Sequence, residues 1–339
     1  MRILALTVLF CLLTGCASEA IDAPLEKANP VVDFGSFHIG GRDIVVKGQK
    51  PQELHLTPGV TSPYDPNGTY VAEQMYVQYF TPSQVKGRFP LLLWHGAWLT
   101  GATYETKPDG APGWLNYFVR QGWKTYLSDA VERGRSGYAL DVFQGPPLPI
   151  AKENAFTRFR IGTKFDPDPA KRTMMPGGQF PPEAFDQFAK QAVPRWTTNN
   201  DVTVKAYIEL VDKVCPCVVM VHSQSGQFGA RVAEARPDKV KALVMVEPSN
   251  GGTEAAKLKG VPVLEVWGDN VESDERWSAN RKVVRQYYDG VRAAGGTVDT
   301  IDLPLQGIKG NSHMVMMDRN SDQVAGMIQA WLVKKGMVQ

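Results

Sequence analysis

Two serines follow the short apolar run CVVMVH, which ends at His222, and either of them could act as a nucleophile. The next residues, SQSGQFGARVAEA, predict the start of a helix and contain Ser223 and Ser225. A serine on a sharp turn between a strand and a helix is an arrangement used for acyl transfer, with small residues two positions before and after it, as in G-x-S-x-G. Because the apolar run ends at His222, the sequence places Ser223 on the turn, although Val221 replaces the usual small residue. We predict that Ser223 is the nucleophile.

A serine hydroxyl is a poor nucleophile unless a general base removes its proton. The chain has five histidines. Four of them stand in or beside predicted strands and loops that do not suit this role: His38, His55, His95 and His222. The fifth, His313, stands in KGNSHMVMMD, a loop just before the last predicted helix. By position and elimination, His313 is the predicted base.

A carboxylate is needed to orient the histidine and to stabilise its charged form. Two predicted strand ends offer one. Asp269, in WGDN, follows the strand predicted over Val261–Trp267, and Glu247, in VMVEPSN, follows the strand predicted over Ala242–Val246. Position alone leaves these two carboxylates nearly equal as candidates for the acid.

Acyl transfer also requires two backbone N–H donors for the oxyanion that develops on the carbonyl oxygen. The residue after the nucleophile, Gln224, supplies one. The loop HGAWLTG, which follows the strand predicted over Pro90–Trp94, offers the second at Ala97. The HG pair is informative because it accompanies the serine turn.

From residue 89 onward, short and continuously apolar segments alternate with helical ones. This pattern is typical of a mostly parallel sheet that is covered by helices on both faces. The predicted strands are Pro90–Trp94, Lys124–Leu127, Cys217–His222, Ala242–Val246 and Val261–Trp267. The predicted helices are Gly113–Gln121, Asp201–Lys213, Gly226–Glu234 and Asn280–Ala294, with a last helix that is capped by Asn320 or Ser321. The apolar face of the last helix is formed by Val324, Met327, Ile328, Trp331 and Leu332.

Two other regions depart from this alternation. Near the N-terminus, Phe34–Gly40 and Asp43–Lys47 predict a hairpin broken by Gly40-Gly41, and Thr69–Phe80 predicts a third strand. Residues 139–196 are rich in proline and phenylalanine and fit no alternation of strands and helices. A loop of this length is usually functional, so we predict an inserted cap over the site. A surface segment packed by its own aromatic side chains is the alternative.

The chain has 339 residues, of which 43% are hydrophobic and can fill a substantial core. One large domain is predicted over 31–339, because no linker divides the predicted sheet. Lys and Arg total 37 and Asp and Glu total 35, and no basic run is suited to a phosphate backbone. A nucleic-acid partner is therefore not expected. Cys215 and Cys217 are predicted to be free thiols rather than a local disulfide, and the sequence places no partners for a metal near them.

The N-terminus has the features of an export signal. MRILALTVLFCLLTGC carries one positive charge at Arg2, an apolar stretch too short to span a membrane, and small residues before Cys16. Its end resembles the lipobox of bacterial lipoproteins, which implies a signal over 1–15, a lipid anchor at Cys16 and a tether over 16–30. An ordinary cleaved signal is the alternative. The resemblance implies an exported lipoprotein on the periplasmic side of the outer membrane, and otherwise a periplasmic or secreted protein.

The assembled residues resemble a branch of bacterial serine esterases within the α/β-hydrolase superfamily. The resemblance runs from about Phe34 onward and rests on HGAWLTGATYETKPDGAPGW, HSQSG, VEPSN, WGDN and GNSHMVMMDRN. It implies the α/β-hydrolase fold, with a mostly parallel central sheet flanked by helices. It also implies a triad and an oxyanion hole, which carried over to this sequence are Ser223, Glu247 and His313 with Ala97 and Gln224. The resemblance therefore favours Glu247 over Asp269.

The same resemblance implies a serine carboxylesterase that acts on a small-molecule ester through an acyl-enzyme, without a metal or an organic cofactor. Members of the branch can carry two adjacent cysteines after HG where this chain has Ala97 and Trp98, which affects the oxyanion loop and the substrate preference. The predicted lining of an apolar pocket is Trp98, Tyr104, Met314 and Met316. Lactone or amide hydrolysis by the same triad, or ligand binding without catalysis, are the alternatives. A homodimer is a further expectation, and membrane contact is expected only through Cys16.

Overall fold

The structure is a computed structural model that describes residues 29–138, 142–143 and 145–339. The predicted signal over 1–15, the predicted anchor at Cys16 and nearly all of the predicted tether lie outside the described residues. Within the described ranges, no helix is long and apolar enough to cross a membrane. In the same ranges, no group of three or more His, Cys, Asp or Glu side chains is arranged to hold a metal ion.

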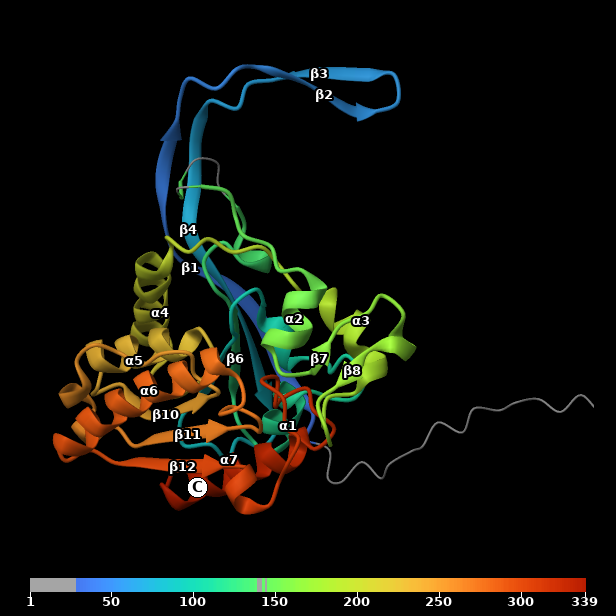
Figure 1. Cartoon of the computed structure of the whole chain (residues 1–339). Helices are drawn as coiled ribbons and strands as arrows, with labels where there is room; N and C mark the ends of the chain where they lie inside the picture. Colours follow the sequence, from blue (N-terminus) through green and yellow to red (C-terminus); the bar gives the residue numbers. More distant parts are fainter. Residues whose placement is uncertain (1–28, 139–141, 144) are drawn as a thin grey trace, which may run out of the picture.

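An eight-stranded sheet in the order β1-β4-β6-β5-β9-β10-β11-β12 forms the centre of the protein (Figure 1). Its strands are β1 Val31–Val46, β4 Gly68–Pro82, β5 Leu91–Trp94, β6 Thr125–Asp129, β9 Cys217–His222, β10 Val240–Val246, β11 Val263–Trp267 and β12 Val298–Asp302. From β6 to β12 the neighbouring strands are parallel, whereas β4 is antiparallel to both β1 and β6. The mostly parallel sheet and all of the strands predicted for it are confirmed.

The last strand, β12, is absent from the prediction because it does not share the pattern of the central strands. Its sequence, VDTID, mixes apolar and acidic residues, and Thr300 is exposed while Ile301 is buried. β12 pairs only with β11, at the edge of the sheet. A continuous apolar run marks a strand that is covered on both faces, and an edge strand such as this one is not.

Helices cover both faces of the sheet (Figure 1). One face carries α1 (Trp114–Arg120) and α7 (Ser321–Lys334), and the other carries α4 (Asn200–Val214), α5 (Ser225–Ala235) and α6 (Glu275–Ala293). Within β5, Leu91 and Leu93 belong to the first core and Leu92 and Trp94 to the second, because successive side chains of a strand point to opposite faces. The predicted helices are all confirmed.

Helix α7 has the apolar face that its sequence predicts. Four of the five predicted side chains are buried and the fifth, Met327, is partly buried against them. Asn320 precedes the helix, but its side chain does not cap it and instead exchanges hydrogen bonds with Asn311. Because Asn311 is two residues before His313, these bonds connect the start of α7 to the histidine loop.

The N-terminal hairpin predicted around Gly40-Gly41 is wrong, because β1 runs unbroken through both glycines. They have φ values of 69° and 92°, which glycine tolerates without strain. A Cβ atom on Gly40 would lie 3.3 Å from the Ala206 Cβ of α4, so this strand passes close to that helix. β1 pairs instead with β4 along nearly its whole length.

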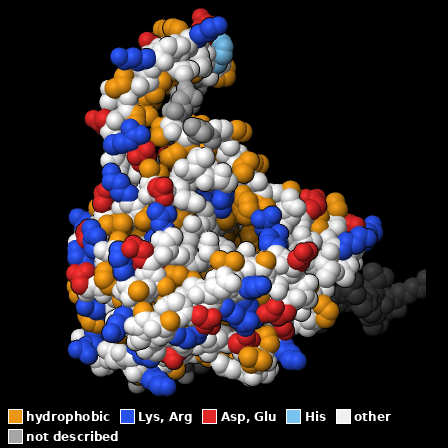
Figure 2. Space-filling model, turned by 60° about the vertical axis from the view of Figure 1, so that its left-hand side comes forward, with side chains coloured by type: hydrophobic (Ala, Val, Ile, Leu, Met, Phe, Trp, Pro, Cys, Tyr) orange, Lys and Arg blue, Asp and Glu red, His pale blue; other side chains and the backbone are white. Residues whose placement is uncertain are grey.

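The C-terminal end of β1 and the N-terminal end of β4 form an arm that projects from the body of the protein (Figures 1 and 2). A second hairpin, β2 (Gln52–Thr57) with β3 (Val60–Tyr64), lies at its tip and is absent from the prediction. Several apolar side chains of the arm are exposed: Val45, Leu56, Val60 and Val71. The homodimer expected from the sequence stays a prediction.

The segment predicted as a cap contains short elements rather than one long loop. They are α2 (Lys152–Arg158), β7 (Gly162–Lys164), β8 (Thr173–Met174) and α3 (Phe185–Ala189). Phe156, Phe165 and Phe185 pack on one another with ring centroids 4.9 to 5.8 Å apart. Elements of two to seven residues are too short to show a periodic pattern in the sequence.

Cys215 and Cys217 form a disulfide in the structure, so the expectation of two free thiols is wrong. Their Cα atoms lie 4.4 Å apart, at the short end of the range that a disulfide spans. The bridge closes the turn between α4 and β9, the strand that leads to Ser223.

Candidate active site

Ser223 lies directly after β9, on the turn that leads into α5. Its backbone φ is 54°, in the left-handed region that residues other than glycine rarely adopt. Backbone hydrogen bonds hold this conformation, since the Ser223 N–H donates to the Val246 carbonyl (3.1 Å) and the Ser223 carbonyl accepts from the Gly226 N–H (2.9 Å). A serine in a strained turn between strand and helix is the geometry of a nucleophile in acyl transfer.

Two glycines explain how the turn tolerates a valine where a small residue is usual. A Cβ atom on Gly229 would lie 2.6 Å from Val221 Cγ1, so the valine occupies the space that a larger residue at 229 would need. A Cβ atom on Gly96 would lie 3.0 Å from Ser223 Cβ, which shows how closely the loop after β5 approaches the serine. The required small residues are therefore on α5 and on that loop, not at position 221.

Ser225, the other candidate nucleophile, has a structural hydrogen bond. It lies in the first turn of α5, is 1% exposed, and its hydroxyl donates to the His95 carbonyl. Ser223 is 7% exposed, and its hydroxyl has no hydrogen-bond partner among the described residues. The structure thus distinguishes the two serines by backbone conformation and by the partner of the hydroxyl.

His313 lies against Glu247, and both side chains are fully buried. His313 Nδ1 is 3.0 Å from Glu247 Oε2, and because a carboxylate can only accept, Nδ1 carries the proton. Nε2 then holds the lone pair, and it has no hydrogen-bond partner in the described part of the chain. An imidazole in this tautomer can take a proton from a serine hydroxyl.

The second oxygen of Glu247 is also fully engaged. Oε1 accepts hydrogen bonds from Arg160 Nη2 (2.7 Å) and from the Gly268 N–H (2.5 Å). A Cβ atom at position 268 would lie 2.8 Å from Oε1, so the glycine permits this close approach. These bonds fix the carboxylate that orients His313.

The electrostatics of the pair set its charge state at neutral pH. Burial alone would raise the pKa of Glu247, but Arg160 and His313 hold this pKa at about 2. Burial lowers the pKa of His313 to about 4, against the opposing effect of Glu247. At neutral pH, Glu247 is therefore a carboxylate and His313 is a neutral imidazole.

This charge state predicts how activity depends on pH. His313 must be neutral to accept a proton, so kcat/KM should be constant over the neutral range and fall tenfold per pH unit below about 4. The measurement is a pH profile of ester hydrolysis, with the fold monitored by circular dichroism. A limb with its midpoint at the ordinary histidine value of about 6.5 that persists in the Asp318→Asn variant would contradict the shielded position of His313.

The carboxyl group of Asp318, near His313, also titrates and can add a limb to the pH profile. Burial raises the pKa of Asp318 to about 6, against the effect of hydrogen bonds from Ser312 and Asn311. Any second limb near that pH should therefore disappear in the Asp318→Asn variant, while the limb that belongs to His313 remains.

The two predicted oxyanion donors present unpaired N–H groups. Neither the Ala97 N–H nor the Gln224 N–H donates a hydrogen bond within the described residues. His95 shapes the loop that carries Ala97, since its Nδ1 donates to the Gly96 carbonyl (2.8 Å) and its Nε2 accepts from the Ala130 N–H (3.0 Å). Two free backbone donors beside a serine can hold an oxyanion.

Asp269, the alternative acid, does not contact His313. Its Oδ2 accepts from the Gly310 N–H (2.8 Å), and its Oδ1 accepts from the Asn270 N–H (2.7 Å). Its backbone carbonyl accepts from Arg160 Nε (2.9 Å). Asp269 therefore fixes loops near the site, while Glu247 is the carboxylate that meets the histidine.

Three residues that surround His313 are absent from the prediction. Arg160 binds Glu247, and the Trp277 ring lies 4.0 Å from the His313 ring. Asp318 accepts hydrogen bonds from the Ser312 N–H (2.8 Å) and the Ser312 hydroxyl (2.7 Å), and so holds the histidine loop. Asp318 follows His313 within the same motif and could have been noticed there. The other two residues carry no local signal.

His222, excluded as the base, has a different position in the site. Its Nε2 donates to the His313 backbone carbonyl (2.9 Å), and the two rings lie 4.6 Å apart. Burial lowers the pKa of His222 well below its usual value, so the ring is neutral. Its contact is with the backbone of the histidine loop, which it helps to position.

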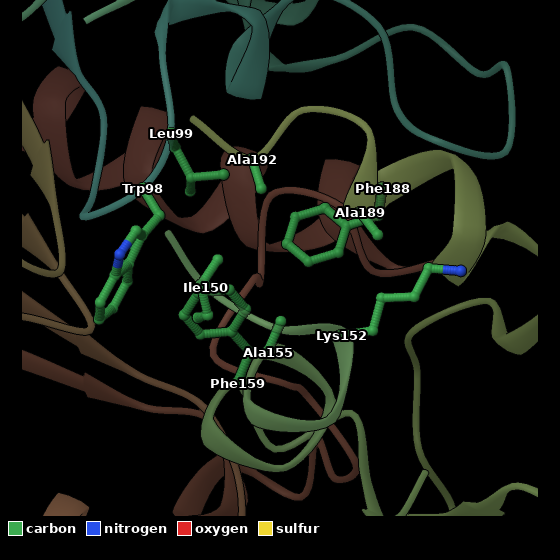
Figure 3. Close-up of a pocket in the computed structure, with 9 residues that line it drawn as sticks. All are labelled: Trp98, Leu99, Ile150, Lys152, Ala155, Phe159, Phe188, Ala189 and Ala192. Atoms are coloured by element: carbon green, nitrogen blue, oxygen red, sulfur yellow. The ribbon is translucent and has the colours of Figure 1, made fainter. Parts of the chain in front are cut away.

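An apolar pocket lies beside the site, with about 320 Å³ of empty space that is partly open to solvent (Figure 3). Its lining consists of Trp98, Leu99, Ile150, Lys152, Ala155, Phe159, Phe188, Ala189 and Ala192. Phe159 also stacks on His313 with a centroid distance of 5.5 Å, which connects the pocket to the histidine. Of the four residues predicted to line an apolar pocket, Trp98 is the one that lines this pocket. Tyr104, Met314 and Met316 are fully buried in the core.

Comparison with known proteins identifies the class of the chain. No family model matches it. A solved structure described as a novel bacterial esterase is 35% identical, with a TM-score of 0.77, and the match covers 91% of this chain and 97% of that one. The probable secreted lipase phiG of a fungal species (strain ATCC 74256) is 27% identical, and the match covers 81% of this chain and 90% of that protein.

The chain thus has the α/β-hydrolase fold, with a mostly parallel eight-stranded sheet flanked by helices. It is a hydrolase of the esterase and lipase class, which acts on ester bonds. It belongs to the family of that bacterial esterase. The fold and the class of reaction expected from the sequence are confirmed.

Proposed function

We propose that the protein is a serine carboxylesterase that works through an acyl-enzyme, with Ser223 as nucleophile, His313 as base and Glu247 as acid. The observation that carries this proposal is the hydrogen bond between His313 Nδ1 and Glu247 Oε2 (3.0 Å). Ser223 has a φ of 54°, and the residue before it, His222, donates to the His313 carbonyl (2.9 Å). Ala97 and Gln224 are the proposed oxyanion donors.

In the first step, Ser223 Oγ attacks the carbonyl carbon of the ester while His313 Nε2 takes the hydroxyl proton. The charge that develops on the carbonyl oxygen is stabilised by the N–H groups of Ala97 and Gln224. The ester C–O bond then breaks, and the alcohol leaves with the proton from Nε2. Glu247 keeps the proton of His313 on Nδ1 and stabilises the imidazolium.

In the second step, water attacks the acyl-enzyme as His313 Nε2 takes one of its protons. The bond to Ser223 Oγ breaks, the serine recovers its proton, and the carboxylic acid is released. No metal or organic cofactor takes part in this scheme.

The segment over 139–196 is the proposed cap, and its described residues reach the site. The His313 N–H donates to the Phe159 carbonyl (2.9 Å), and Arg160 binds Glu247. The pocket beside the site is lined on one side by this segment and on the other by the loop of Trp98 and Leu99. We propose that the apolar part of the ester binds there, since burial of apolar surface is the main contribution such a pocket can make.

A partition experiment tests the acyl-enzyme directly. Two butyrate esters with different leaving groups, phenol and p-nitrophenol, are hydrolysed in the presence of methanol, and butyric acid and methyl butyrate are quantified. A common acyl-enzyme predicts the same ratio of the two products from both esters. Ratios that depend on the leaving group would show that water attacks each ester directly, and the proposal would fail.

We further propose that the chain is exported and lipidated at Cys16, as its N-terminal sequence predicts. The similarity to a protein named as a secreted lipase supports export. In a bacterial host, full-length wild type and the Cys11→Ala variant should incorporate radiolabelled palmitate, and Cys16→Ala should not. Unlabelled wild type would instead indicate an ordinary cleaved signal.

A further inference from the structure

Two arginines lie against Trp98, the residue after the proposed oxyanion donor Ala97. The guanidinium carbon of Arg158 is 5.3 Å from the centroid of the Trp98 ring, and that of Arg195 is 5.2 Å from it. The Trp98 Nε1 donates to the Leu148 carbonyl (3.0 Å), which fixes the indole. Both arginines are half-buried. Trp98 lies at one end of the apolar pocket, opposite Lys152 (Figure 3).

A third arginine, Arg133, connects the two loops that carry the proposed oxyanion donors. It is 3% exposed, and its terminal nitrogens donate to the Leu99 carbonyl (3.3 Å) and to Gln224 Oε1 (3.3 Å). Its Nε and the Nε of Arg195 are buried without a hydrogen-bond partner among the described residues. Most buried polar atoms have a hydrogen-bond partner. Arg160 and Arg281 each also have one buried nitrogen without a partner among the described residues, so Arg133 and Arg195 differ from them in their ion pairs.

These three arginines also lack anionic partners. In the described part of the chain, none of them forms an ion pair with a carboxylate, whereas the buried Arg160 and Arg281 do. Asp274, the carboxylate that acts on Arg158, accepts from the Trp277 N–H and contacts Arg276. Lys152, at the other end of the pocket, is paired with Asp186.

The positive charges act on one another as well. Burial, and secondly the charge of Arg195, lower the pKa of Arg133 to about 9. Burial and the charge of Arg158 lower the pKa of Arg195, and burial and the charge of Arg276 lower that of Arg158. Like charges brought together without counter-ions destabilise a fold. A bound anion would relieve this repulsion.

We propose that Arg158 and Arg195, which both lie against Trp98, bind an anionic group of the substrate, so that the natural ester also carries a carboxylate. This inference rests on the proposed function, because it places the anion next to the proposed oxyanion loop. Arginine suits the role, since its planar guanidinium can form paired hydrogen bonds with a carboxylate. The apolar pocket would hold the hydrocarbon part of the same molecule.

Matched esters test this preference and show on which side of the ester the anion lies. The first pair is p-nitrophenyl hemiglutarate and the ester in which an isopropyl group replaces its carboxylate. The second pair is p-acetoxybenzoate and p-isopropylphenyl acetate, which carry the difference on the alcohol side. In at least one pair, kcat/KM for the anionic ester should exceed that for the neutral ester by about tenfold, and added salt should reduce the difference.

Variants of Arg158 and Arg195 test whether these two residues cause the preference for anionic esters. Arg158→Met and Arg195→Met keep an unbranched side chain against Trp98 but remove the charge, and each should lower the ratio of anionic to neutral kcat/KM by about tenfold. Arg292→Met, on the exposed face of α6, is the matched control and should leave the ratio unchanged.

Inhibition of the wild type gives a readout that does not depend on the folding of a variant. With a neutral ester as substrate, phenylvalerate should inhibit competitively, with a Ki about tenfold below that of its carboxamide. Equal inhibition by acid and amide, or a preference for the neutral ester in both pairs, would overturn the inference while the esterase proposal stands. If no ester of the panel is hydrolysed, the proposed function fails and this inference fails with it.

Discussion

Replacing Ser223 by alanine should lower kcat/KM for a short-chain p-nitrophenyl ester by about 10⁴-fold or more, because it removes the hydroxyl on which the proposed acyl-enzyme forms. The measurement is steady-state hydrolysis by the purified variant, after its circular dichroism spectrum has been matched to that of the wild type. The side chain of Ser223 makes no hydrogen bond with the described residues, so alanine at this position should leave the fold intact.

Ser225→Ala is the matched control for this prediction. The Ser225 hydroxyl donates to the His95 carbonyl, so its removal should cost about 1–2 kcal/mol in the free energy of unfolding and leave kcat/KM within about tenfold of wild type. A variant at 225 that folds normally and has no activity, beside an active Ser223→Ala, would mean that the assignment of the nucleophile is wrong.

The second large loss of activity is expected when Glu247, the proposed acid, is replaced. Glu247→Gln should lower kcat/KM by about 10³-fold or more, because the neutral amide neither stabilises the imidazolium nor fixes the tautomer of His313. Its Oε1 position also faces Arg160, so the variant leaves a buried cation without its partner. The same assay of hydrolysis measures the loss.

Asp269→Asn tests the alternative at the neighbouring strand. The Asp269 carboxylate accepts from two backbone N–H groups and does not meet His313, so its amide variant should keep kcat/KM within about tenfold of wild type. The reverse result, with Asp269→Asn inactive and Glu247→Gln active, would make Asp269 the acid.

The turn that carries Ser223, the proposed nucleophile, could be predicted from the sequence, because its position depends on the local pattern of apolar residues. The apolar run CVVMVH predicts where β9 ends, and the structure has the positive φ at the next residue. The missing small residue at position 221 is explained only in three dimensions, since the valine packs where Gly229 has no side chain. A motif of five residues does not include a compensating change six residues after the serine.

The proposed acid could not be chosen from the residues alone, because β10 and β11 are neighbouring parallel strands and each is followed by a carboxylate. The two carboxylates, Glu247 and Asp269, differ in the direction in which each side chain points. Glu247 has a φ of 49°, and its carboxylate meets His313, whereas that of Asp269 turns to the N–H groups of Gly310 and Asn270. Such directions depend on tertiary contacts.

The contact between the inserted segment and Glu247 also could not be predicted from the local sequence pattern. Arg160 is 87 residues from Glu247 in the sequence and lies between short elements that have no clear periodicity. At the N-terminus, Gly40-Gly41 suggests a turn, yet β1 continues through them because β4 pairs along its length. In both regions the long-range partner decides the local structure, as is usual for strands and short loops.

The identity of the nucleophile is tested most directly by the site at which a serine-directed phosphonate binds covalently. An ethyl p-nitrophenyl phosphonate is incubated with the enzyme, and the modified residue is located by fragmenting the labelled peptide in a mass spectrometer. We expect loss of activity in step with one phosphonyl group on Ser223, and no labelling of Ser223→Ala. A label on Ser225, or full inactivation with Ser223 unmodified, would contradict this expectation.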